Sequence, residues 1–269
     1  MRNSFVMTSK NVLAQLLCRA TLLPIAAAVF AFDVIVPKAN AQIEEIVVTA
    51  QKREQSLLDL GMAASVVDEN EIRDRRIAMV TDLSLFTSNS TIKEFVPGLM
   101  PIITIRGVGL NDFNAANNPT TGVFIDQVPL SSLALLSSDF YDLARMEVAK
   151  GPQGTVYGRN ATAGALNIVT SAPSFDGRMG RIHAGVGNYE LGELEGMYNA
   201  PLSDTVAMRV AGKLISQSEG YYDNRSTGTN VGEREVYMGR IGLLWRPKED
   251  TEVQLKMEKQ SADSELGSP

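Results

Sequence analysis

The sequence has little of the chemistry that hydrolases and metalloproteins need. Its 269 residues include one cysteine, Cys18, and one histidine, His183. A lone histidine without a second histidine or cysteine ligand in the mature chain argues against a transition-metal site. The hydrolase motifs G-x-S-x-G and H-E-x-x-H are also missing from the sequence. We therefore expect no enzymatic activity, no metal site and no cofactor.

The sequence also lacks an excess of positive charge. It has 25 lysines and arginines against 31 aspartates and glutamates, a formal net charge of -6. Proteins that bind nucleic acids need a basic surface to neutralise phosphates. We expect no nucleic-acid partner.

Long apolar runs are confined to the first 41 residues. Arg2 and Lys10 precede the apolar block Thr21–Phe32, which is shorter than the roughly 20 residues that a membrane-spanning helix needs. Ala39-Asn40-Ala41 then supplies a small-residue cleavage site. The pattern predicts a secretory signal peptide over 1–41, cut before Gln42. An N-terminal membrane anchor is the alternative.

Removal of the signal peptide would change the charge and the cysteine content of the chain. The leader holds four of the 25 basic residues, one of the 31 acidic residues and Cys18, so the mature chain carries 21 basic against 30 acidic residues, a net charge of -9. An exported chain without disulfides depends on burial and hydrogen bonding for its stability.

The most informative stretch is DLARMEVAKGPQGTVYGRNATAGALNIVT, residues 142–170. Its glycines at 151, 154, 158 and 164 lie between two segments that are typical of short strands. A nucleotide-binding loop would need Lys-Ser or Lys-Thr after the last glycine, or G-x-G-x-x-G between a strand and a helix, and neither is present. The glycines therefore predict structural turns.

The same stretch resembles, nearly residue for residue, the end of the plug domain in TonB-dependent outer-membrane receptors. There a GPQGTLYGRN-like segment leads into an INIVT strand. The resemblance implies an α+β plug domain followed by the first antiparallel strands of a transmembrane β-barrel, which this sequence leaves incomplete. The domains it implies are a signal peptide at 1–41, a TonB box and linker at 42–54, the plug at 55–172, and about five barrel strands at 173–269.

A β-branched segment near the predicted mature N-terminus resembles the TonB box of these receptors. A free strand of this kind can add itself to the edge of another protein's sheet. An ordinary first strand of the domain is the alternative. The implied coupling residues are Glu45, Ile46, Val47, Val48, Thr49 and Ala50.

The plug region predicts a mixed α/β domain. Asp68 is placed to cap a helix that starts near Glu69, with Glu71 at the capping-box position. The other expected elements are strands at Ala63–Val67, Ile102–Arg106 and Gly122–Asp126, a helix around Met79–Phe86, and a helical turn at Ser137–Leu143.

Two sets of plug residues are candidates for function. A loop rich in asparagine offers hydrogen-bond partners and one aromatic ring, and plug apical loops touch the ligand in the family; a solvated linker is the equal alternative. Its candidate ligand-binding residues are Asn111, Asp112, Phe113, Asn114, Asn117 and Asn118. Arg106 and Arg159 lie in segments that should be buried, so we expect them to pair with barrel carboxylates beyond residue 269, as plug arginines do in the family.

From residue 178 the hydrophobic period changes to two. Apolar and charged residues alternate in five segments of about ten residues, which is typical of outer-membrane strands with one lipid face and one aqueous face. A soluble β-sandwich is the alternative. Tyr198 and Trp245 fit an interfacial aromatic girdle. The apolar sets begin at Ile182, Leu194, Val206, Tyr237 and Val253, with tight turns at Pro201–Asp204 and Pro247–Asp250 and a long loop at Gln217–Arg234.

The resemblance implies a receptor in the Gram-negative outer membrane that imports a scarce ligand, with an iron–siderophore complex as the expected cargo. The implied partners are TonB with its inner-membrane energising complex, outer-membrane lipid and the extracellular ligand. A passive porin or a surface adhesin is the alternative, although neither needs a coupling segment or a plug. Plugged transporters use about 22 strands, so we expect this sequence to be the N-terminal portion of a longer protein.

Overall fold

The computed structural model describes residues 47–48, 55–56, 60–94, 100–110, 118–136, 139–225 and 229–264. The predicted signal peptide lies outside these residues. So do Glu45, Ile46, Thr49 and Ala50 of the coupling segment, and Asn111, Asp112, Phe113, Asn114 and Asn117 of the apical loop. Residues from Glu45 onward form one compact unit.

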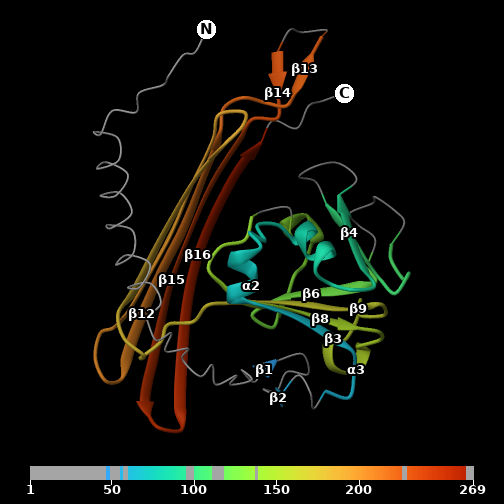
Figure 1. Cartoon of the computed structure of the whole chain (residues 1–269). Helices are drawn as coiled ribbons and strands as arrows, with labels where there is room; N and C mark the ends of the chain where they lie inside the picture. The colour runs from blue at the N-terminus through green and yellow to red at the C-terminus, as the bar shows by residue number, and fades with distance from the viewer. Residues whose placement is uncertain are drawn as a thin grey trace, which may run out of the picture. The chain divides into compact units, whose positions relative to one another are not determined.

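The plug is built on a mixed five-stranded sheet of order β3-β8-β9-β6-β7 (Figure 1). Only β6 and β9 are parallel neighbours. The predicted strands at 63–67 and 122–126 are present as β3 and β6, and the glycine-rich stretch lies between β8 and β9. The bounds are β3 Ala64–Asp68, β8 Leu143–Lys150, β9 Gly164–Thr170, β6 Thr121–Ile125 and β7 Val128–Pro129.

Two smaller pieces complete the strand content of the plug. β4 (Ser90–Glu94) pairs with β5 (Pro101–Ile105), which is the strand predicted at 102–106. Near the chain start, β1 (Val47–Val48) pairs antiparallel with β2 (Gln55–Ser56).

The helices are short. α2 (Glu69–Asp74) begins as predicted, because the Asp68 carboxylate accepts the Glu71 N–H at 2.8 Å. The helix predicted at 79–86 is instead the 3-10 helix η2 (Val80–Leu85), whose first turn is fixed by N–H groups of Ala78 and Met79 donating to Asp82. Two further turns are η3 (Leu133–Leu136) and α3 (Gly154–Tyr157). None of the helices in the described part of the chain is long and apolar enough to cross a membrane.

The helical turn predicted at 137–143 is wrong for the residues of this segment that the structure describes. The turn occurs earlier, as η3, and Leu143 already begins β8. Asp142 has a left-handed backbone with φ of 46°, which a helix does not accept. Its carboxylate and backbone are instead held by the second sheet, as shown below.

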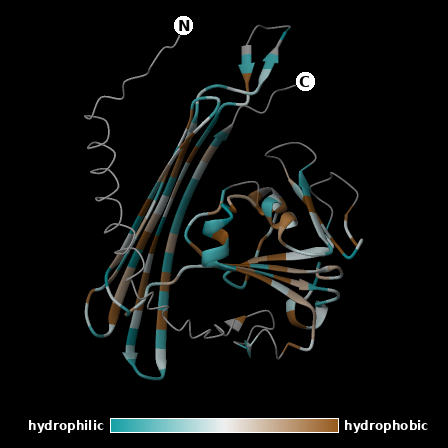
Figure 2. Ribbon diagram, viewed as in Figure 1, coloured by the Kyte–Doolittle hydropathy of each residue, from teal (hydrophilic) through white to brown (hydrophobic). Residues whose placement is uncertain are grey.

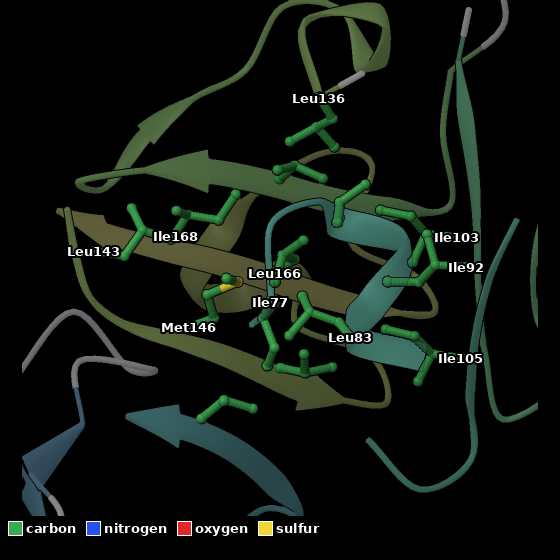
Figure 3. Close-up of a cluster of buried hydrophobic side chains, with 14 of the residues drawn as sticks. Ile77, Leu83, Ile92, Ile103, Ile105, Leu136, Leu143, Met146, Leu166 and Ile168 are labelled. Atoms are coloured by element: carbon green, nitrogen blue, oxygen red, sulfur yellow. The ribbon is translucent and has the colours of Figure 1, made fainter. Parts of the chain in front are cut away.

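One face of the plug sheet packs against η2 and the β4–β5 pair (Figure 3). Val80, Leu83 and Met146 are fully buried there. Burying each such side chain stabilises the fold by roughly 1.5–3 kcal/mol. The plug therefore has a hydrophobic core of its own.

The second sheet is antiparallel and consists of five long strands in the order β10-β11-β12-β15-β16 (Figures 1 and 2). All five strands predicted from the period of two are present. The loop predicted between β12 and β15 contains the small hairpin of β13 (Tyr222–Asn224) and β14 (Thr229–Val231). The long strands are β10 Met179–Gly187, β11 Leu191–Pro201, β12 Val206–Gln217, β15 Arg234–Lys248 and β16 Thr251–Ser264.

Candidate functional site

The two faces of the long-stranded sheet have opposite chemistry, and the charged face is the buried one. Arg209 and Arg240 are only 6% and 5% exposed, whereas Ile182 and Val186 on the other face are 81% and 95% exposed. Figure 2 shows the resulting alternation along the strands. A protein in water buries apolar side chains and exposes arginine. The reversed pattern fits a wall whose apolar face meets lipid.

The apolar side chains of the exposed face form a band across the five strands, and the position of this band indicates that the strands are tilted. On β10 the band is centred on Ala184. The pairing through β11 and β12 places Ala184 at the same level as Tyr237 of β15. On β16 it is centred on Leu255, which pairs with Leu243 of β15. The band thus shifts by the six residues from Tyr237 to Leu243 over the four strand-to-strand steps. At about 3.4 Å per residue and about 4.8 Å between strands, the strands incline by about 45° to the direction that crosses the band, close to the tilt of transmembrane barrels.

The buried face of the sheet holds the plug through Asp142. Arg209 on β12 donates to both carboxylate oxygens, with Nε–Oδ2 at 2.9 Å and Nη2–Oδ1 at 2.5 Å. Arg240 on β15 donates to the backbone carbonyls of Tyr141 and Asp142 at 3.0 and 2.9 Å. The Asp142 N–H donates to Glu195 on β11 at 3.4 Å. Side chains of three neighbouring strands therefore form hydrogen bonds with one plug residue.

Tyr141 extends this contact to the fourth strand. Its hydroxyl donates to Glu258 of β16 at 2.9 Å, and the Arg240 guanidinium lies 4.6 Å above its ring. Burial raises the pKa of Tyr141 above its ordinary value, and the nearby Glu258 and Asp142 carboxylates raise this pKa further while Arg240 opposes them. The phenol therefore stays protonated and keeps its role as donor.

Additional ion pairs join the plug to the sheet. Asp126, at the end of β6, accepts from Thr170 at the end of β9 and from Lys256 of β16. The remaining ion pairs are Glu69 with Arg181 at 2.7 Å and Asp139 with Arg234. These acidic plug residues were not identified from the sequence, because their partners lie between 67 and 130 positions away.

The connection between plug and sheet is fixed as well. Asn199 of β11 is 1% exposed; its side chain accepts from Ser174 N at 2.8 Å and donates to the carbonyls of Ser174 and Gly177. A Cβ at Gly242 would lie 3.1 Å from Pro173, so glycine allows the connection to pack against β15. The end of the plug nearest the connection is thus attached to the wall.

A cavity of about 630 Å³ lies between α2 and strands β10 to β12. It is lined by both basic and acidic groups, including Arg73, Arg181, Glu193 and His183. Lys213 forms an ion pair with Glu193 there at 2.8 Å. In the described part of the chain no group of three or more metal-ligating side chains comes together.

The two arginines predicted to be buried are exposed, and a lysine is buried instead. Arg106 and Arg159 are both exposed, so the expectation of burial does not hold in this structure, while pairing with barrel carboxylates stays a prediction. The buried cation at this end of the plug is Lys150, 7% exposed, which donates to Ser65 at 2.6 Å and to Ser88 at 3.0 Å. Burial lowers the pKa of Lys150, and the positive charge of Arg106 lowers it further. Sequence analysis missed Lys150, although its place directly before Gly151 was a signal.

Of the predicted coupling residues the structure describes Val47 and Val48. Both are paired with β2, and Val48 is fully buried. Asn118 is the only candidate of the apical loop among the described residues, and it is exposed. Ligand binding by this loop stays a prediction.

Comparison with known proteins shows what this chain is similar to. Residues 56–165 match the TonB-dependent Receptor Plug Domain. The pesticin receptor of Yersinia pestis is 28% identical over 217 residues, which cover 78% of this chain and 32% of that receptor. The ferrioxamine receptor of Yersinia enterocolitica is 26% identical over 77% of this chain and 28% of its own length.

Solved structures agree with the fold. The ferric yersiniabactin uptake receptor FyuA from Y. pestis superposes with a TM-score of 0.64 at 26% identity, covering 75% of this chain and 32% of FyuA. The ferric-catecholate import receptor Fiu from E. coli K12, at 19% identity and a TM-score of 0.64, covers 81% of this chain and shows the same fold. The chain spans about a third of the length of these proteins. The expected fold class, a plug followed by antiparallel barrel strands, is confirmed, and the chain resembles TonB-dependent receptors in its plug segment and in its fold.

Proposed function

We propose that this chain supplies the plug and the adjoining wall strands of an outer-membrane receptor that imports a ferric siderophore with energy from TonB. The observation that carries the proposal is the attachment of the plug, through Asp142 and Asp126, to the buried charged face of a sheet whose other face is apolar and exposed. This arrangement suits a plug inside a lipid-embedded wall. The names of the ferrioxamine and yersiniabactin receptors support a ferric siderophore as the ligand.

The β1–β2 pair supports the coupling step. Val47 and Val48 belong to the segment proposed to pair with TonB, and their pairing with Gln55 and Ser56 occupies one edge of that short strand. Strand addition needs a free edge. In our proposal, ligand binding favours release of this segment, and TonB then pairs with it and pulls on the plug.

The Arg106–Lys150 pair supports a further contact with the wall. Two cations lie close together, one of them buried, and in the described part of the chain neither has a carboxylate partner. Leaving such charge unpaired is costly. We propose that wall carboxylates outside the described residues complete this cluster, with Arg159 as a further member.

The experiment is uptake of a radiolabelled ferric siderophore by a strain in which the intact receptor is the only route, with Val47→Pro compared against Val47→Ile. Proline removes a strand N–H and blocks pairing with TonB, whereas isoleucine keeps a β-branched side chain. We expect Val47→Pro to abolish uptake while surface binding of the siderophore stays at the parent level, and Val47→Ile to transport normally.

Uptake by Val47→Pro at the parent rate would show that this segment is not the coupling strand. Siderophore-independent diffusion of small solutes, unaffected by deletion of TonB, would identify the passive porin instead. Surface attachment without any uptake would identify an adhesin.

A further inference from the structure

Three tyrosines form an exposed aromatic cluster at one end of the long-stranded sheet. Tyr189 lies in the turn between β10 and β11, and Tyr221 and Tyr222 lie at the start of the β13–β14 hairpin. The Tyr189 and Tyr221 rings are 5.3 Å apart at 87°, and the Tyr221 and Tyr222 rings are 5.9 Å apart at 90°. The three side chains are 45%, 49% and 64% exposed. We call these residues the tyrosine triad.

The backbone around the triad is arranged to hold the rings together. Tyr189 and Glu190 both have positive φ, 62° and 54°, at positions where a tight hairpin usually has Asn-Gly. Their strained turn is held from the next loop, because Glu219 N–H donates to the Tyr189 carbonyl at 3.2 Å and Ser218 Oγ to Glu190 at 2.6 Å. A Cβ at Gly232 would lie 2.8 Å from the Tyr221 ring, so only glycine lets that ring pack here.

The charge around the triad selects the kind of ligand. The loops at 188–190 and 218–233 contain Glu190, Glu219, Asp223 and Glu233 but only one basic residue, Arg225. All four carboxylate side chains are exposed, and none of them forms an ion pair in the part of the chain that the structure describes. The faces of aromatic rings attract cations, and nearby carboxylates strengthen that attraction. An anionic ligand would be repelled.

We propose that the tyrosine triad is a binding site for an ammonium or guanidinium group displayed by a ligand. The triad lies at the strand ends opposite the plug connection, because β10 starts after that connection and ends beside Tyr189. Only its orientation toward the cell exterior rests on the proposed function. Recognition of the cation by rings and carboxylates does not depend on transport.

The test measures binding of a fluorescent hexalysine peptide to the receptor purified in detergent, at low and at high salt. Tyr221→Phe keeps the ring and Tyr221→Leu removes it, so the pair isolates the aromatic contribution. Tyr198→Leu is the matched control, because Tyr198 is 47% exposed on the apolar face of β11, away from the triad. We expect Tyr221→Leu to weaken binding about two- to fivefold, in line with one exposed cation–π contact, and Tyr221→Phe and Tyr198→Leu to bind as the parent does.

Two further arms examine the charge requirement. Glu219→Gln together with Asp223→Asn should weaken binding, and spermine should displace the peptide, since the site recognises the cation and not its carrier. Equal binding by Tyr221→Leu and Tyr221→Phe would overturn the proposal, as would tighter binding of a fully acetylated, neutral peptide. These outcomes leave the uptake experiment unaffected, so a failure here is separate from a failure of the proposed transport function.

Discussion

Arg209 holds Asp142 through two parallel hydrogen bonds, and this bidentate ion pair is buried between the plug and the sheet. The two side chains are 7% and 2% exposed. A planar guanidinium matches a carboxylate in this geometry, which lysine does not reproduce. The pair therefore fixes the start of β8 relative to the wall as well as balancing charge.

Removing one partner should loosen the plug. Arg209→Gln leaves the Asp142 carboxylate buried with only the longer Arg240 contact at 3.7 Å, and loss of one member of a buried pair typically costs about 3–5 kcal/mol. We expect faster proteolysis within residues 60–170 and a lower urea midpoint for unfolding of the plug. Arg246→Gln is the matched control, because its pair with Glu252 is exposed and worth about 0–1 kcal/mol. Equal midpoints for the two variants would contradict a structural role for Asp142.

Gly164 at the start of β9 should not tolerate a side chain. A Cβ there would lie 2.3 Å from the Ala149 carbonyl oxygen and 2.8 Å from Ile105, and backbone cannot move aside as a flexible side chain can. Gly164→Ala should prevent correct assembly of the plug, with a loss of at least about 1–3 kcal/mol in a chain that still folds. Gly154→Ala, at a site with open space around it, should be neutral or slightly stabilising in α3. Heat-modifiable migration and protease resistance of outer-membrane fractions provide the measurement.

In the plug on its own, without the proposed wall carboxylates, the buried Lys150 should make stability depend on alkaline pH. Its pKa is lowered in the folded protein, so below the ordinary value of about 10.4 the unfolded chain binds a proton that the folded plug has released. The free energy of unfolding should therefore rise with pH between the lowered pKa and about 10.4. Lys150→Met should remove this rise, whereas Lys93→Met, at an exposed site on β4, should keep it. Urea titrations followed by near-ultraviolet circular dichroism would test this, and parallel pH profiles for the parent and Lys150→Met would refute it.

Local patterns predicted the elements of this fold well. The period of two located all five long strands, and the Asp68 cap located α2, because both signals depend on near neighbours in sequence. The conformation of residues 139–142 could not be predicted in this way. The left-handed Asp142 is determined by Arg209 and Arg240, 67 and 98 positions further along the chain.

The candidate site was harder to predict for the same reason. An arginine beside a glycine shows that charge is present but not whether folding buries it. Arg106 proved exposed and Lys150 buried, although both lie next to glycines in strand-ending segments. Which acidic plug residues face the wall depends on the register of β12, β15 and β16, which no single segment encodes.

The apolar face of the sheet should behave as a lipid-facing surface whose sensitivity depends on depth. On β15 the apolar band runs from Tyr237 to Trp245, so Ile241 lies at its centre, while Glu235 on the same face lies just beyond it. A lysine at the bilayer midplane costs about 2–4 kcal/mol, falling to about 0–1 kcal/mol near the interface. Ile241→Lys should therefore reduce the amount of folded receptor in the outer membrane and lower its guanidinium midpoint in lipid vesicles, while Glu235→Lys should change neither by much. In a soluble β-sandwich, both would be surface substitutions that change the free energy of unfolding by no more than about 0.5 kcal/mol. Equal, small effects would therefore show that this face does not meet lipid.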